Sequence, residues 1–232
     1  MSQFMVAGLE VRRSGLPVVR GVELEVTSGR ISVVLGANGA GKTTFLEGLS
    51  GSIPISGGRI VLDGTELQRA RPGARARAGL AHIEEGRTVF RHMTLDQNLR
   101  VASHPSTKGT WAYELFPELK ARRNTKAGLL SGGEQQMLVI ARALVGRPKV
   151  VLIDEMSAGL APVVVTRLMR AVRQLADDGL AIVLVEQFPA LALTVGDRAY
   201  VMRRGRMVYT GACAELKESP GHLHHLYLGD SD

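Results

Sequence analysis

The sequence predicts an α/β fold with a mostly parallel core sheet, an antiparallel β edge and a helical insertion. Three apolar runs rich in β-branched residues are continuous, which is typical of parallel strands covered on both faces. They occupy residues 31–35, 150–153 and 180–185. Residues 22–26 alternate apolar and polar side chains, and residues 59–62 lead into Asp63-Gly64, so both segments predict antiparallel strands.

The remaining segments are assigned from polarity and turn residues. Residues 94–126 are more polar, so we expect a helical insertion there, within an approximate helical subdomain at residues 88–145. Arg204-Gly205 stands between two short apolar stretches and predicts a late hairpin. We expect residues 1–232 to form a single domain, because 232 residues with 45% hydrophobic content can fill one large core.

The amino-acid composition limits where the protein can reside and which partners it can bind. The apolar runs are far shorter than the roughly 20 residues that a membrane-spanning helix needs. Cys213 is the single cysteine, which fits a reducing cytoplasm. The net charge of +7 suits an anionic partner such as a nucleotide, a membrane surface or nucleic acid.

The densest basic stretch contains no aromatic residue that could stack on a base. It comprises Arg69, Arg71, Arg75 and Arg77. We interpret it as a solvated helix face, and nucleic acid is the less favoured partner.

A glycine-rich sequence follows the first apolar run. It reads GANGAGKT at residues 36–43, the pattern of a phosphate-binding P-loop between a strand and a helix. Lys42 is placed to reach the β- and γ-phosphates of a nucleotide, and Thr43 can offer its hydroxyl to Mg²⁺. The nucleotide-binding residues predicted from this loop are Gly36, Ala37, Asn38, Gly39, Ala40, Gly41, Lys42, Thr43 and Thr44.

Two acidic residues end the second apolar run. Asp154 and Glu155 follow it directly, at the carboxyl end of a buried strand, where α/β sheets place ligand-binding groups. With a P-loop in the same chain, Asp154 suits the Mg²⁺ shell and Glu155 can orient the attacking water. A pair of acids exposed in a turn is the structural alternative.

The segment LSGGEQQ at residues 130–136 precedes a run with helical spacing. Ser131 and Glu134 have the spacing of a capping box, and Gly132 and Gly133 leave the backbone N–H groups of the helix start uncovered. Such a helix end can hold an anion. In isolation the segment would read as an ordinary helix cap.

The P-loop, the LSGGEQQ segment and the acidic pair, in this order, resemble the ATP-binding subunit of ABC transporters. The resemblance covers essentially the whole chain and implies the P-loop NTPase fold of ABC ATPases, with ATP and Mg²⁺ as ligands. It also implies that two such subunits face each other head to tail. Each ATP then lies between one P-loop and the Ser131–Gly133 loop of the opposite subunit.

Further motifs look like the LivF-type ATPase of branched-chain amino acid importers. They are EGR at residues 85–87, TLDQNL at 94–99, LFPEL at 115–119, GLAP at 159–162, VEQ at 185–187 and YLG at 227–229. This likeness implies transmembrane permease subunits, indirectly an extracytoplasmic solute-binding protein, and a location on the cytoplasmic face of the membrane. Related ATPases serve importers of urea, short amides or other hydrophobic amino acids, and these alternatives stay open.

Four positions depart from the pattern of most ABC ATPases, and one of them is Ala161, which stands where an aspartate usually faces the other subunit. Glu85 stands where a glutamine approaches Mg²⁺, and a carboxylate is also a hard oxygen ligand. Gln187 stands at the position that is usually histidine, and its amide can donate a hydrogen bond to the γ-phosphate but cannot become cationic. Arg13 aligns with the aromatic residue that stacks on adenine, and a guanidinium plane can also stack on a base.

The resemblance therefore implies an ATPase in which Lys42, Glu155 and Gln187 carry catalysis. The alternative from another class is a soluble ABC ATPase that acts on nucleic acid. Such proteins usually carry a long coiled-coil insertion or two ATPase halves, and a chain of 232 residues has room for neither.

Overall fold

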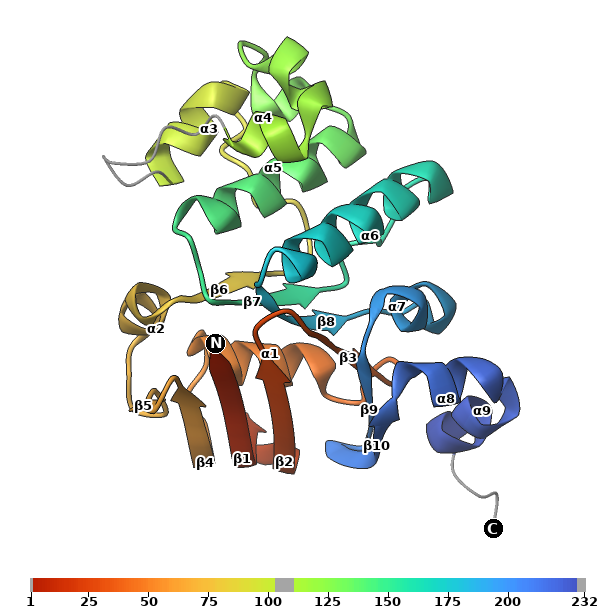
Figure 1. Ribbon diagram of the computed structural model, residues 1–232. Helices are drawn as coiled ribbons and strands as arrows, with labels where there is room; N and C mark the ends of the chain where they lie inside the picture. The colour runs from red at the N-terminus through yellow and green to blue at the C-terminus, as the bar shows by residue number, and fades with distance from the viewer. Residues whose placement is uncertain (1, 103–110, 229–232) are drawn as a thin grey trace.

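The computed structural model describes residues 2–102 and 111–228 (Figure 1). Gly229, the last residue of the YLG motif, lies outside this part of the chain, as do residues 103–110 of the expected helical segment. Within the described residues no helix has both the length and the apolar character needed to cross a membrane.

A six-stranded sheet forms the centre of the molecule, in the order β10-β9-β3-β8-β7-β6. Its strands are β3 (Ile31–Leu35), β6 (Leu80–Ile83), β7 (Val150–Asp154), β8 (Ala181–Val185), β9 (Arg198–Arg203) and β10 (Arg206–Ala212). Every neighbouring pair is parallel except β9 and β10, which form the predicted late hairpin. The three strands predicted from continuous apolar runs, β3, β7 and β8, are buried along their whole length.

The antiparallel strands form a sheet of their own rather than an edge of the central one. Its order is β2-β1-β4-β5, with β1 (Gln3–Arg13), β2 (Leu16–Thr27), β4 (Ile55–Leu62) and β5 (Thr65–Glu66). Exposed and buried positions alternate along most of β1 and β2, so one face is solvated and the other faces the core. This pattern is typical of antiparallel sheets, which pack one face on the core and leave the other in water.

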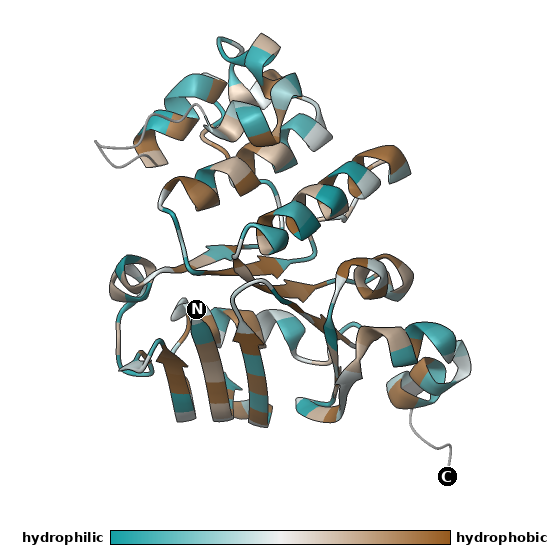
Figure 2. Ribbon diagram, viewed as in Figure 1, coloured by the Kyte–Doolittle hydropathy of each residue, from teal (hydrophilic) through white to brown (hydrophobic). Residues whose placement is uncertain are grey.

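Helix α1 (Lys42–Ser50) lies between the two sheets, and other helices cover the opposite face of the central sheet (Figure 1). Phe45, Leu46 and Leu49 of α1 are fully buried in the core between the sheets. The central strands are the most uniformly apolar part of the ribbon, whereas the helices alternate between polar and apolar faces (Figure 2).

Helices also form over the described part of the predicted insertion, residues 94–102 and 111–126, as expected. The elements on this side are α3 (Leu95–Ala102), α4 (Trp111–Leu115), η1 (Pro117–Arg122), η2 (Ala127–Leu129), α5 (Gly132–Val145) and α6 (Pro162–Asp177). The remaining helices are α2 (Pro72–Ala78), α7 (Pro189–Val195), α8 (Cys213–Glu218) and α9 (Pro220–Leu228).

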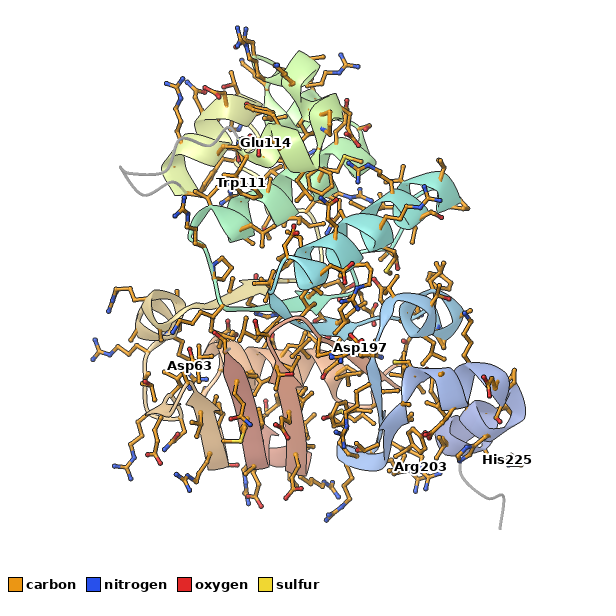
Figure 3. All side chains as sticks on the ribbon, viewed as in Figure 1. Asp63, Trp111, Glu114, Asp197, Arg203 and His225 are labelled. Atoms are coloured by element: carbon orange, nitrogen blue, oxygen red, sulfur yellow. The ribbon has the colours of Figure 1, made fainter. Side chains whose placement is uncertain are left out.

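Two aspartates, Asp63 and Asp197, connect the layers (Figure 3). Lys149 Nζ lies 2.6 Å from the Asp63 carboxylate and joins the antiparallel sheet to the segment before β7. This hydrogen bond from Lys149 helps to lower the pKa of Asp63 below its usual value. Asp197 accepts from the backbone N–H of Ile31 at 2.8 Å and from Arg173 Nη1 at 2.9 Å. These contacts fix β3, the strand that leads into the P-loop, against α6.

The interpretation of the basic stretch as a solvated helix face is wrong for one of its members. Arg75 is 3% exposed and directs its guanidinium to backbone carbonyl oxygens at the end of α1 and in the loop before α2. The other three arginines of the stretch are exposed. Arg75 therefore belongs to the packing of α1 and not to a surface for nucleic acid.

Candidate functional site

The P-loop connects β3 to α1, as the motif predicts. Gly39 and Gly41 have φ angles of 79° and 108°, which favour glycine and turn the backbone into the start of the helix. The Lys42 side chain is 5% exposed, and its ammonium group donates to the carbonyl oxygens of Gly36 at 2.9 Å and Ala37 at 3.3 Å. A cation and the uncovered N–H groups of a helix start thus meet at one point, which is an arrangement for binding phosphate.

A cleft of ≈ 540 Å³ opens beside this loop, which is within the range of sites for small-molecule ligands. Five separate segments line it: β2, the P-loop with the start of α1, and the residues that follow β6, β7 and β8. The lining residues are Val18, Asn38, Gly39, Gly41, Lys42, Thr43, Thr44, Glu85, Glu155, Ala158 and Gln187. The parallel strands therefore bring Glu85, Glu155 and Gln187 to the P-loop at their carboxyl ends; the sequence predicts this placement for Glu155.

The acidic pair divides into a buried and a partly exposed carboxylate. Asp154 is 1% exposed, and neither of its carboxylate oxygens has a hydrogen bond of good geometry to any described residue. Burial raises the pKa of Asp154 to about 6, the neighbouring Thr43 hydroxyl opposes that rise, and Glu155 adds to it. A buried carboxylate without a partner, beside a hydroxyl, offers the hard oxygen ligands that Mg²⁺ prefers, so these residues fit the ion.

Glu155 faces the cleft. Its Oε1 lies 3.6 Å from Lys42 Nζ, and its side chain is 15% exposed. Its backbone adopts φ = 41°, a conformation that non-glycine residues rarely adopt and that is often found at functional sites. The amide of Gln187 donates to Asn38 Oδ1 at 3.4 Å, which places the end of β8 against the P-loop.

Arg13 lies beside the cleft but does not line it. Its Nε donates to Thr44 Oγ1 at 3.0 Å, and its guanidinium forms an ion pair with Glu47. The Arg13 side chain is 47% exposed, so the guanidinium is held against α1 and still reaches solvent. The contribution of Glu47 was missed because nothing in its local sequence marks it as part of a site.

The Ser131–Gly133 segment forms the predicted capping box at the start of α5. Ser131 Oγ accepts from the N–H of Glu134 at 3.3 Å, and the Glu134 carboxylate accepts from the N–H of Ser131 at 2.7 Å. None of Ser131, Gly132 and Gly133 lines the cleft of its own chain. The structure of one chain therefore brings the P-loop and the acidic pair together but leaves the LSGGE loop apart from them.

A further buried acid stands next to the site. Glu186 is fully buried, and its carboxylate accepts a hydrogen bond from the Ser157 hydroxyl. Burial raises the pKa of Glu186 to about 6. Sequence reasoning used Glu186 only as part of the VEQ motif and gave it no structural role.

The family model described as "ABC transporter" matches residues 19–158, more than half of the chain.

The chain belongs to the ABC transporter family.

Two relatives within this family are named for branched-chain amino acid transport. The ATP-binding protein BraG of Pseudomonas aeruginosa, named for high-affinity branched-chain amino acid transport, is 41% identical over 90% of this chain and 91% of its own length. The probable branched-chain amino acid transport protein LivF of Archaeoglobus fulgidus is 35% identical over 88% and 89%. The lipopolysaccharide export protein LptB of Escherichia coli K12 is 32% identical over 99% and 98%.

Solved structures agree with the fold. An ATP-binding cassette of an ABC transporter in its ADP conformation superimposes with a TM-score of 0.86 at 22% identity, over 99% of this chain and 100% of that chain. A nucleotide-free cassette gives a TM-score of 0.88 at 22% identity, with the same coverage. The predicted ABC ATPase fold is confirmed.

Proposed function

We propose that this chain is the ATP-binding and ATP-hydrolysing subunit of an importer of branched-chain amino acids. The observation that carries the ATPase proposal is that the P-loop Lys42 and the carboxylate of Glu155, whose backbone has the unusual φ of 41°, face each other at 3.6 Å in one cleft. The choice of cargo is supported by the two relatives that are named for this transport and match about nine-tenths of the chain.

In the proposed reaction the P-loop N–H groups and Lys42 bind the phosphates of ATP. Thr43 and Asp154 would hold Mg²⁺, with Glu85 nearby, and the ion when bound neutralises charge on the phosphate oxygens. Glu155 orients a water molecule and accepts its proton as the water oxygen bonds to the γ-phosphorus. The bond from that phosphorus to the bridging oxygen breaks, and ADP leaves with the electron pair.

Two further side chains bind parts of the nucleotide. Gln187 donates an amide hydrogen bond to the γ-phosphate; its NH₂ group has two N–H donors, and its contact with Asn38 Oδ1 uses one of them. Arg13 offers a guanidinium plane on which adenine stacks, and its contacts with Thr44 and Glu47 hold that plane in place.

The complete site needs a second ATPase subunit. We propose a head-to-tail pair, in which the Ser131–Gly133 loop of one subunit closes over the ATP that the other binds. The separation of this loop from the cleft of its own chain supports the proposal. We treat residues 1–232 as one ATP-binding domain with a helical subdomain at residues 88–145, because α3, α4 and α5 gather away from the antiparallel sheet (Figure 1).

The pair would act on permease subunits at the cytoplasmic face of the membrane, with a solute-binding protein delivering the cargo. The experiment reconstitutes the chain with its permease subunits in liposomes and measures ATP hydrolysis with the binding protein loaded with leucine or with urea. Stimulation by leucine alone is expected. Stimulation by urea alone would overturn the proposal that the cargo is a branched-chain amino acid and would leave the ATPase proposal in place.

A further inference from the structure

Arg87 links three loops: its own, which follows β6, the loop that follows β7, and the LSGGE loop at the start of α5. It follows Glu85 by two residues, and its Nη2 donates to the carbonyl oxygens of Ala158 at 3.4 Å and Gly159 at 3.3 Å. A Cβ atom built on Gly132 would lie 2.9 Å from Arg87 Cζ and 3.0 Å from its Nη1, so the guanidinium lies directly against the LSGGE backbone.

The guanidinium keeps donors free. Its Nε and Nη1 make no hydrogen bond to any residue in the described part of the chain, and the Arg87 side chain is exposed. Arg87 does not line the cleft of its own chain. It therefore points its unused donors to the surface next to the start of α5.

The side chains that line the cleft supply little positive charge. Of the described residues that line it, Lys42 is the only cation, whereas Glu85 and Glu155 are acidic and Asp154 lies beneath them. Arg13 is already paired with Glu47. A bound nucleoside triphosphate would add several negative charges to this group, and Mg²⁺ would offset only two of them. Charge on the γ-phosphate is what a phosphoryl-transfer site has to stabilise.

We propose that Arg87 supplies a further cation in trans, beside Lys42 and the proposed Mg²⁺, to the γ-phosphate of the ATP that is bound by the P-loop of the partner subunit. The inference rests on the proposed head-to-tail pair, in which the start of α5 faces the partner's ATP. The guanidinium beside Gly132 then lies next to the same phosphate. Its contacts with Ala158 and Gly159 fix the distance between the two loops that face the partner.

The test is a complementation experiment with two variants of the full chain, Lys42→Ala and Arg87→Gln. Each variant alone is expected to lose about a hundredfold or more of the ATP hydrolysis rate, because each lacks one charge at both sites of the dimer. In a mixed dimer, the Arg87→Gln chain supplies an intact Lys42 and the Lys42→Ala chain supplies an intact Arg87 to the same ATP site. The other site of that dimer lacks both charges. An equimolar mixture should therefore regain about a quarter of the wild-type rate, since half of the dimers are mixed and each has one complete site.

The result separates trans from cis action. If Arg87 served the ATP of its own chain, both sites of the mixed dimer would be defective, and the absence of any regained rate would overturn the proposal. An Arg87→Gln rate equal to that of wild type would overturn it as well. A wild-type chain that neither binds nor hydrolyses MgATP would overturn the proposed function itself.

Two controls exclude a loss of rate caused by unfolding or by general charge. Arg91→Ala removes an exposed arginine four residues away, whose side chain makes no ion pair among the described residues, and should hydrolyse ATP at the wild-type rate. Arg87→Lys keeps the charge and should retain a rate within about tenfold of wild type. Thermal unfolding and the Kd for MgATP of Arg87→Gln should stay close to wild type, because the change acts on hydrolysis and not on folding or cis binding.

Discussion

Replacing Arg75 by methionine should remove about 4 kcal/mol from the free energy of unfolding, because the guanidinium satisfies four backbone carbonyl groups from a buried position. Its Nη1 donates to Gly48 at 2.7 Å and Leu49 at 2.6 Å, both near the end of α1. Its Nε and Nη2 donate to Ala70 at 3.0 Å and Gln68 at 3.2 Å.

The magnitude follows from the two carbonyl groups at the end of α1. Their bonds to Arg75 are buried, and a buried acceptor that loses its partner costs roughly 1–3 kcal/mol. Methionine fills most of the volume of the arginine stem, so the loss reports hydrogen bonds and charge more than a cavity. A positive charge at the carboxyl end of α1 also interacts favourably with the helix dipole.

The assay is urea unfolding followed by circular dichroism, with Arg77→Met as the matched control. Arg77 lies on the same short helix but is exposed, so its replacement should change the free energy of unfolding by no more than about 0.5 kcal/mol. A loss below about 1 kcal/mol in Arg75→Met would refute the reasoning, as would equal losses in both variants.

Three further changes have defined outcomes. Burial raises the folded-state pKa of Glu186 to about 6 from the usual 4.5, so its proton stabilises the fold below pH 4.5 and that contribution is lost as the pH rises through 6. Glu186→Gln should therefore raise the free energy of unfolding by about 2 kcal/mol at pH 8 and hardly at all at pH 4, and an equal gain at both pH values would contradict burial of the charge as the cause. Gly205→Ala should cost about 2–4 kcal/mol in urea unfolding, because its Cβ would overlap the Val18 carbonyl, whereas Gly64→Ala, with a similar φ of 77° but open space, should cost about 1 kcal/mol. Arg13→Ala should raise the Kd for MgATP about tenfold in a fluorescence titration, because adenine would lose the guanidinium plane on which it stacks. An unchanged Kd would show that Arg13 does not bind the nucleotide.

The parts of the fold that were predicted have strong local patterns. β3, β7 and β8 are continuous apolar runs, and continuous burial is what the structure shows for them. β1 escaped prediction because its alternation of buried and exposed residues slips at Gly8, where the ladders with β2 and β4 change register. β6 escaped because it is four residues long and contains His82.

In the site, too, local motifs could be predicted from the sequence, whereas contacts between residues far apart in the chain could not. The motifs predict the P-loop and the acidic pair, and the strand ends bring Glu155 into the cleft beside the P-loop because parallel strands share an edge. The roles of Arg75 and Arg87 depend on carbonyl oxygens up to 27 and 72 residues away in sequence, which no local pattern reveals. Position on the helix made Arg75 resemble its exposed neighbours, and only packing distinguishes it.

The most direct measurement of the central claim compares ATP hydrolysis by the purified wild-type chain and by Glu155→Gln, with size-exclusion chromatography in the presence of MgATP. The account predicts hydrolysis by the wild type, a loss of about a hundredfold or more in the variant, and an ATP-dependent dimer that the variant retains. A Glu155→Gln rate equal to that of the wild type would contradict the assignment of this cleft as the hydrolytic site.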